Sequence, residues 1–98
     1  MSFVVKIRDS VRRKIARWNL PDWLLVEIYL RLSERLANEP ARTLIRARQP
    51  FDGMMYHLSV VDPHHRLTQH DCYFHILYSQ DEETLDVVNF GYLRQTGL

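Results

Sequence analysis

Residues Cys72–Gln80 (CYFHILYSQ) alternate between two sets of side chains, as a strand in the middle of a sheet does. One face would carry Phe74, Ile76 and Tyr78, and the other Tyr73, His75, Leu77 and Ser79. Similar runs precede it at Met54–Val61 and follow it at Thr84–Phe90. Because the connections between the runs are short and polar, the pattern predicts an antiparallel meander with Cys72–Gln80 in the middle.

The residues upstream of the meander predict one strand and two helices. Phe3–Arg8 alternates and predicts a strand, followed by a helix over about Ser10–Asn19 with one apolar stripe. A second helix, over about Pro21–Asn38, has a wide apolar face. We therefore expect an α+β domain in two layers, in the order β-α-α-β-β-β. An antiparallel sheet would have a helical hairpin packed on one face, and its other face would be open.

Three other segments lack these periodicities. Ala41–Gln49 is basic and predicts at most a short helical turn. Asp62–Asp71 contains Pro63 and three histidines and predicts a loop, and the tail Gly91–Leu98 is expected to fray.

Length and composition indicate one domain over residues 1–98, with a modest core. No apolar run approaches the roughly 18–20 residues of a membrane span, and the N-terminus does not resemble a signal peptide. These features predict a cytoplasmic protein that does not interact with membranes. The single cysteine, Cys72, lies in the central strand and is expected to be a buried, inert thiol.

The charge is unevenly distributed along the chain. Residues 1–50 contain eleven Lys and Arg and five Asp and Glu, whereas residues 51–98 contain two and seven. A basic half is typical of a protein that binds a polyanion or an acidic protein. Solvated helix faces would produce the same pattern, so charge alone leaves both readings open.

The order of the elements and several short motifs resemble the RelE/ParE superfamily of bacterial toxins. The resemblance covers about Val4 to Arg94. It rests on Ala16-Arg17-Trp18 at the end of the first helix, and on Asn38-Glu39-Pro40 followed by a basic linker. The second half adds Tyr56-His57-Leu58, Phe74–Tyr78 with an acidic turn after it, and Leu85–Val88 leading to Tyr92-Leu93-Arg94.

The resemblance implies the toxin component of a toxin–antitoxin system, with a cognate antitoxin protein as partner and no cofactor. Some members of the superfamily are endoribonucleases that cleave mRNA on the ribosome, and this chain is expected to act in that way. The reaction is attack of a ribose 2′-OH on the adjacent phosphate, which requires a base, a cation and an acid. The alternative is a non-enzymatic member, either directed at DNA gyrase or reduced to binding another protein.

Carried across by position, the resemblance implies a catalytic site of His57, His75, Tyr92 and Arg94. His75 departs from the arginine that is common in the family's middle strand, and imidazole binds phosphate less well than guanidinium does. If the turn spans about Asp62–His70, His57 and His75 become cross-strand neighbours on the open face. The alternative is that both histidines are solvated and have no catalytic role.

Basic residues upstream are the candidate RNA contacts, namely Arg12, Arg13, Arg42, Arg46 and Arg48. His64, His65 and His70 lie near Asp62 and Asp71 and suggest a metal site. Their spacing fits a solvated turn better, so no metal is expected. Trp18 and Trp23 are expected to pack in the core.

Overall fold

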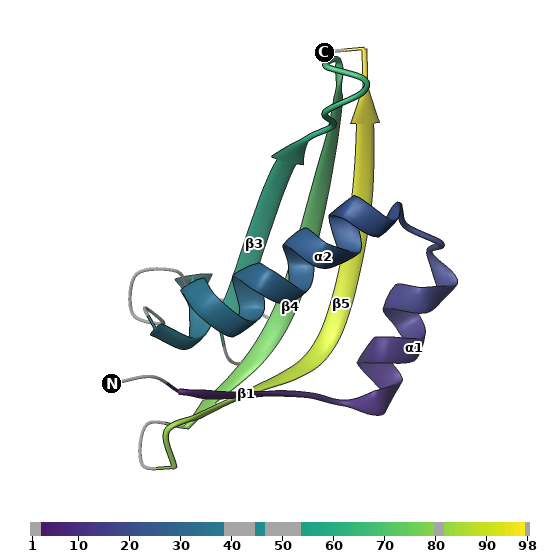
Figure 1. Ribbon diagram of the computed structural model, residues 1–98. Helices are drawn as coiled ribbons and strands as arrows, with labels where there is room; N and C mark the ends of the chain where they lie inside the picture. The colour runs from purple at the N-terminus through teal and green to yellow at the C-terminus, as the bar shows by residue number, and fades with distance from the viewer. Residues whose placement is uncertain (1–2, 39–44, 47–53, 80–81, 98) are drawn as a thin grey trace.

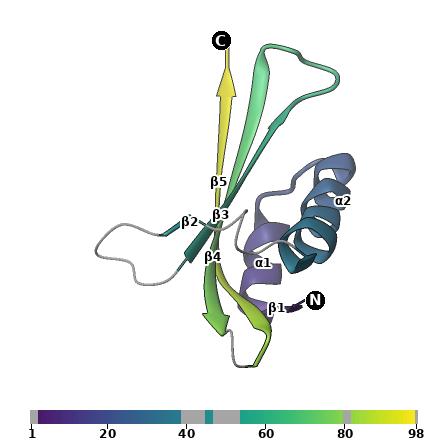
Figure 2. The ribbon, with the colours of Figure 1, turned by 90° about the vertical axis from the view of Figure 1, so that its left-hand side faces the viewer.

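A computed structural model describes residues 3–38, 45–46, 54–79 and 82–97 of the chain. In chain order the elements are β1 (Val4–Ile7), α1 (Asp9–Arg17), α2 (Asp22–Leu30), a π-helical segment η1 (Arg31–Leu36), β2 (Ile45–Arg46), β3 (Met54–Val61), β4 (Thr68–Ser79) and β5 (Thr84–Thr96). The strands form one sheet, and the helices lie against one side of it (Figures 1 and 2). No helix in the described part of the chain is long and apolar enough to cross a membrane.

The sheet has five strands in the order β1-β5-β4-β3-β2. The predicted antiparallel meander is confirmed, with β4 paired to β3 on one side and to β5 on the other. The first strand, β1, is parallel to β5, so the sheet is mixed. The short strand β2 pairs antiparallel with β3, where the sequence predicted a helical turn. The rest of Ala41–Gln49 lies outside the described residues.

The helical layer follows the apolar spacing of the sequence. Val11 and Ile15 of α1 are buried, one turn apart, and Asp9 provides an acidic residue in the first turn. Asn19, at φ 50°, adopts the left-handed conformation between the two helices, which asparagine tolerates better than most residues.

The second helix buries one residue in every four, namely Leu24, Ile28, Leu32 and Leu36, each at most 1% exposed. A repeat of four exceeds the 3.6 residues of an α-helical turn, so the buried stripe would drift around a straight α-helix. The wider π-helical turn of η1 counteracts this drift. The described helix reaches Asn38, where the sequence predicted its end, and residues 39–44 lie outside the described part of the chain, apart from the strand β2 that follows them.

The core lies between this layer and the inner face of the sheet. Cys72, Phe74 and Ile76 of β4 are 0% exposed, and Phe74 packs on Tyr56 and Phe90. The predicted inner face of the central strand is therefore confirmed up to Ile76, although Tyr78 is 39% exposed. Confirmation of the inner face also identifies the opposite face of the sheet, which no helix of the described residues covers (Figure 2).

Two strands are longer than the sequence predicted. β4 begins at Thr68, four residues before Cys72, and β5 continues to Thr96, where a frayed tail was expected. The hairpin between β3 and β4 and the end of β5 therefore project beyond α2 (Figure 1). The Gly97 N–H donates to the Leu67 carbonyl at 3.0 Å and joins the end of the chain to this hairpin.

Candidate functional site

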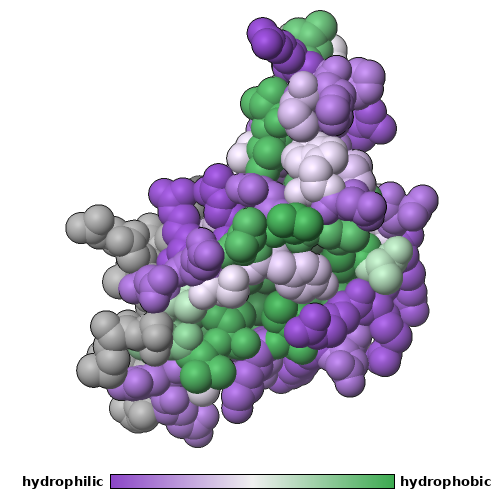
Figure 3. Space-filling view, in the orientation of Figure 1, coloured by the Kyte–Doolittle hydropathy of each residue, from purple (hydrophilic) through white to green (hydrophobic). Residues whose placement is uncertain are grey.

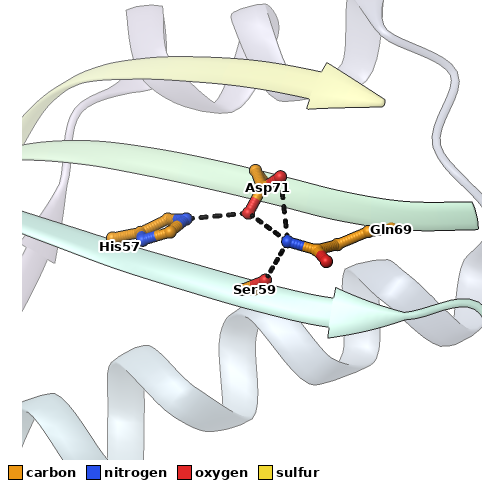
Figure 4. Close-up of polar contacts among 4 residues, drawn as sticks. All are labelled: His57, Ser59, Gln69 and Asp71. Atoms are coloured by element: carbon orange, nitrogen blue, oxygen red, sulfur yellow. Dashed lines mark hydrogen bonds and ion pairs between the residues drawn. The ribbon is translucent and has the colours of Figure 1, made fainter. Parts of the chain in front are cut away.

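Four polar side chains meet on the face of the sheet opposite the helices, in the middle of β3 and the first residues of β4 (Figure 4). His57 Nε2 lies 2.9 Å from Asp71 Oδ1. The Gln69 amide donates to Ser59 Oγ at 2.7 Å and to both oxygens of Asp71, at 3.2 and 3.3 Å. The His57 ring stacks flat on Tyr73, with centroids 4.5 Å apart and planes at 1°. His57 is thus fixed by a carboxylate at its edge and a ring on one face.

The environment of Asp71 determines its charge. Burial raises the pKa of this carboxyl, but hydrogen bonds from His57, Gln69 and Ser59 lower it by more, so its pKa lies below the ordinary value. Asp71 is therefore ionised at neutral pH and accepts the Nε2–H of His57. This leaves the lone pair of neutral His57 on Nδ1, which is the arrangement of a histidine used as a general base.

His57 and His75 lie on the same face, as predicted, but they are not directly opposite. His57 pairs with Tyr73, and His75 pairs with Met55. The predicted turn over Asp62–His70 was too long, so the predicted register was wrong by two residues. Because side chains alternate with a period of two, this error leaves both histidines on the open face and places them diagonally.

Tyr92 and Arg94 lie on the other face of the sheet, away from the two histidines. Tyr92 pairs with the buried Cys72, and Arg94 pairs with His70. The Tyr92 hydroxyl contacts His70 Nδ1 at 2.5 Å, and His70 Nε2 lies 2.9 Å from Asp62 Oδ2. The four residues implied as catalytic therefore fall into two groups, separated by the sheet itself.

Three of the five candidate RNA contacts lie in the described part of the chain. Arg12 and Arg13 lie on α1, in the helical layer, and the Arg12 guanidinium is 5.7 Å from the centroid of the Tyr29 ring. Arg42 and Arg48 lie outside the described residues. Arg46 is in β2, paired with Met54 at the edge of the sheet.

The open face of the meander carries little positive charge. Arg94 is the sole Lys or Arg in the sequence of β3, β4 and β5, and it faces the helices. Phosphate contacts for a polyanion on the open face would therefore come from neighbouring segments, not from the three central strands.

An apolar groove lies on the helical side, between β1 and α2. It has a volume of about 570 Å³ and is lined by Val5, Leu25, Val26, Tyr29 and Leu30, among others. Apolar side chains gather along this side of the molecule (Figure 3). Val26 and Leu30 are 58% and 45% exposed.

Metal and thiol chemistry find no support in the described part of the chain. No group of three or more His, Cys, Asp or Glu side chains there could bind a metal ion. Burial raises the pKa of Cys72 to about 12, and its side chain is inaccessible, as the sequence predicted.

Sequence reasoning missed the residues that complete both histidine sites. Asp71 and Gln69 orient His57, and His70 connects Asp62 to Tyr92, but all of Asp62–Asp71 was predicted to be loop. Strand length gave no signal, since the predicted strand Cys72–Gln80 has nine residues and could pair with all eight residues of β3. In the structure three of the residues that pair with β3, namely Gln69, His70 and Asp71, precede Cys72.

No model of a known protein family matches the sequence, and no curated protein matches it. Among solved structures, the chain is similar to a chain of the RelBE2 toxin–antitoxin complex of Mycobacterium tuberculosis. The TM-score is 0.68 at 15% sequence identity, over 95% of this chain and 93% of that one. At this identity the likeness concerns the fold. The chain has the RelE-type toxin fold, as its sequence motifs predicted.

Proposed function

We propose that this protein is the toxin of a toxin–antitoxin system and cleaves mRNA on the ribosome. The observation that carries the proposal is the His57–Asp71 pair on the uncovered face of a RelE-type fold. A carboxylate-oriented imidazole on an accessible sheet face is suited to removing a proton from a ribose hydroxyl. The similarity to a chain of a toxin–antitoxin complex supports a cognate antitoxin as the partner.

The proposed reaction uses the two histidines in sequence. Nδ1 of His57 takes the proton of the 2′-OH, and the 2′-oxygen attacks the adjacent phosphorus. The bond from phosphorus to the 5′-oxygen breaks, leaving a 2′,3′-cyclic phosphate. Protonated His75 gives its proton to the departing 5′-oxygen. The charge that develops on phosphorus requires a cation, and Arg46, at the edge of the sheet, is the candidate, with the other upstream arginines in support.

The experiment is induction of the chain, without its partner, in a bacterial host, with growth followed and mRNA ends mapped in the same cells. We expect growth arrest and new cuts inside translated reading frames. His57→Ala and His75→Ala should each reduce cleavage roughly 10²–10⁴-fold, the usual contribution of a positioned acid or base. Asp71→Asn should reduce it less, because it leaves the imidazole in place but removes the charge that selects its tautomer.

Arg66→Ala is the matched control, because Arg66 is exposed in the hairpin loop and touches neither histidine. Full cleavage by well-expressed, folded His57→Ala would refute the site assignment.

A non-enzymatic role is the second candidate, favoured by the lack of Lys and Arg on the open face of the meander. Such a protein would be directed at DNA gyrase or would bind another protein. Growth arrest with intact mRNA, together with loss of supercoiling by purified gyrase, would support the gyrase-directed form. Normal growth at good expression would support the protein-binding form.

A further inference from the structure

A cleft of about 590 Å³ lies on the helical side of the sheet, away from the His57–Asp71 pair. It opens between the connection of α1 to α2 and the projecting ends of β4 and β5. Its walls include Trp18, Trp23, His70, Tyr92 and Arg94. The volume is in the range of small-molecule sites, roughly 300–1,000 Å³.

The cleft is lined by a hydrogen-bonded series of three side chains, the buried Asp62 and His70 and the partly buried Tyr92. The side chains of Asp62 and His70 are 8% and 3% exposed. Asp62 Oδ1 also accepts the backbone N–H groups of His64 and His65, at 2.8 and 3.1 Å. The contact with His70 and these two N–H groups lower the pKa of Asp62 to about 2. Asp62 is therefore ionised, and it accepts hydrogen bonds from His70 and from two backbone N–H groups of the protein.

The hydrogen bonds between Asp62 and His70 and between His70 and Tyr92 also fix which way the Tyr92 hydroxyl donates. The Asp62 carboxylate selects the His70 tautomer with hydrogen on Nε2, so Nδ1 accepts the Tyr92 O–H. Burial raises the pKa of Tyr92, against a smaller opposite effect of Arg94, so the hydroxyl stays protonated. Its oxygen lone pairs remain available to accept a hydrogen bond from a ligand amine or hydroxyl.

The mouth of the cleft combines a cation with aromatic rings. Arg94 has no ion pair or hydrogen bond among the described residues, so its guanidinium can bind an anion. Trp18 is 49% exposed and meets Tyr92 at 63° between ring planes, a contact that engages at most one face of the indole. Trp23 meets His70 at 74°. A planar ring could therefore stack on the indole of Trp18.

We propose that this cleft binds a nucleotide, free or at the end of an RNA chain. The base would stack on Trp18, a sugar hydroxyl or base amine would donate to Tyr92, and the phosphate would bind Arg94. A planar ring joined to a phosphate matches this set of groups better than a simple anion or an apolar ligand does. The site is separate from the open face on which the proposed RNA cleavage depends.

The test uses fluorescence, because Trp18 and Trp23 are the two tryptophans of the chain and both line the cleft. Purified full-length protein is titrated with AMP, GMP, CMP and UMP, and separately with adenosine and inorganic phosphate. We expect a saturable change in tryptophan fluorescence with the nucleotides. Adenosine should bind at least about tenfold more weakly, because it has no phosphate to accept hydrogen bonds from the Arg94 guanidinium. A 5′-phosphorylated RNA trinucleotide tells whether the ligand is a free nucleotide or the end of an RNA chain. Tighter binding than AMP would indicate an RNA end, and weaker binding than AMP would indicate a free nucleotide.

Two variants locate the binding, with a matched control. Arg94→Ala should weaken AMP binding at least about tenfold, and Trp18→Leu should weaken AMP binding but not phosphate binding. Arg66→Ala, which removes an exposed arginine from the neighbouring loop, should bind as the wild type does. The absence of a saturable change, equal affinity in Arg94→Ala, or inorganic phosphate binding as tightly as AMP would overturn the proposal.

A measurement on the wild type covers the case in which a variant fails to fold. The two indole N–H resonances should both shift on addition of AMP, and unchanged resonances would overturn the proposal. Mapping of mRNA ends in cells that express the wild-type protein or His57→Ala tests the proposed RNA cleavage independently, so failure of one proposal can be told from failure of the other.

Discussion

Two histidines in this protein are each oriented by a carboxylate, and their surroundings give them different roles. His57 is bound to Asp71 on the open face, and its side chain is 34% exposed. His70 is bound to Asp62 on the helical side, and its side chain is 3% exposed. In each pair the carboxylate fixes the ring by binding Nε2. The difference is at Nδ1, which contacts the Tyr92 hydroxyl in His70 and has no hydrogen bond among the described residues in His57.

Asp62→Asn tests the buried pair through its pH dependence. The pKa of Asp62 is depressed from 3.8 to about 2 in the folded protein, so its contribution to stability is present above pH 3.8 and is lost as pH falls through 2. The wild type should therefore be more stable than Asp62→Asn at pH 6, and the difference should shrink between about pH 4 and pH 2. Urea midpoints measured across this range check the prediction. A difference that stays constant down to pH 2 would contradict it.

Cys72 should be unreactive in the folded protein. Its side chain is 0% exposed and burial raises its pKa to about 12, so very little thiolate forms at pH 8 and none is accessible. A chromogenic disulfide reagent should label no thiol in the native protein and one in urea. Rapid labelling without denaturant would show that the central strand opens.

Prediction from sequence was most successful where one face of a residue pattern is apolar. Alternation with the buried Phe74 and Ile76 placed His75 on the outer face of β4, and alternation with the buried Tyr56 and Leu58 placed His57 on the same face of β3. Alternation along a single strand could not identify Asp71 as the partner of His57, because that contact depends on the register between β3 and β4. Register is set by the length of the hairpin loop, which the polar residues from Asp62 onward do not reveal.

At the scale of elements, the long second helix depends on its four-residue apolar repeat. Leu24→Ala should cost about 2–5 kcal/mol of unfolding free energy, because Leu24 is 0% exposed in the core. Leu30→Ala, in the same helix, removes a side chain that is 45% exposed and should cost less than about 1 kcal/mol. Urea unfolding of both variants measures the difference. Equal costs would mean that α2 does not pack on the sheet as the structure shows.

The ends of elements were predicted less well than their centres. β4 starts at Thr68 and β5 runs to Thr96 because the two strands pair with each other over these residues. The sequence did not predict this extension, because the residues concerned show no regular apolar alternation. Backbone hydrogen bonds between neighbouring strands stabilise this extension, and one strand's sequence does not report them. Trp18 was expected in the core and is 49% exposed, because the projecting strands create a cleft that helix periodicity does not indicate.

At the scale of the whole molecule, the sheet separates two chemically different surfaces. The open face presents a base oriented by Asp71 and no Lys or Arg of the meander strands, whereas the helical side combines the apolar groove with a cleft that contains Arg94. Buried residues of β4, Cys72 and Phe74 among them, lie between the surfaces. Side chains on opposite faces of a strand do not touch, so substitutions on one surface should leave the other intact.

A pair of single variants tests this separation directly. His57→Ala should lose mRNA cleavage and keep the fluorescence response to AMP, because Trp18, Trp23 and Arg94 are on the far side of the sheet from it. Arg94→Ala should lose the response to AMP and keep mRNA cleavage. The double variant should lose both, with each loss equal to that of the corresponding single variant within experimental error. If Arg94→Ala instead abolished cleavage while remaining folded, the cleft would take part in the reaction, and Tyr92 and Arg94 would act with the histidines as one site despite their separation across the sheet.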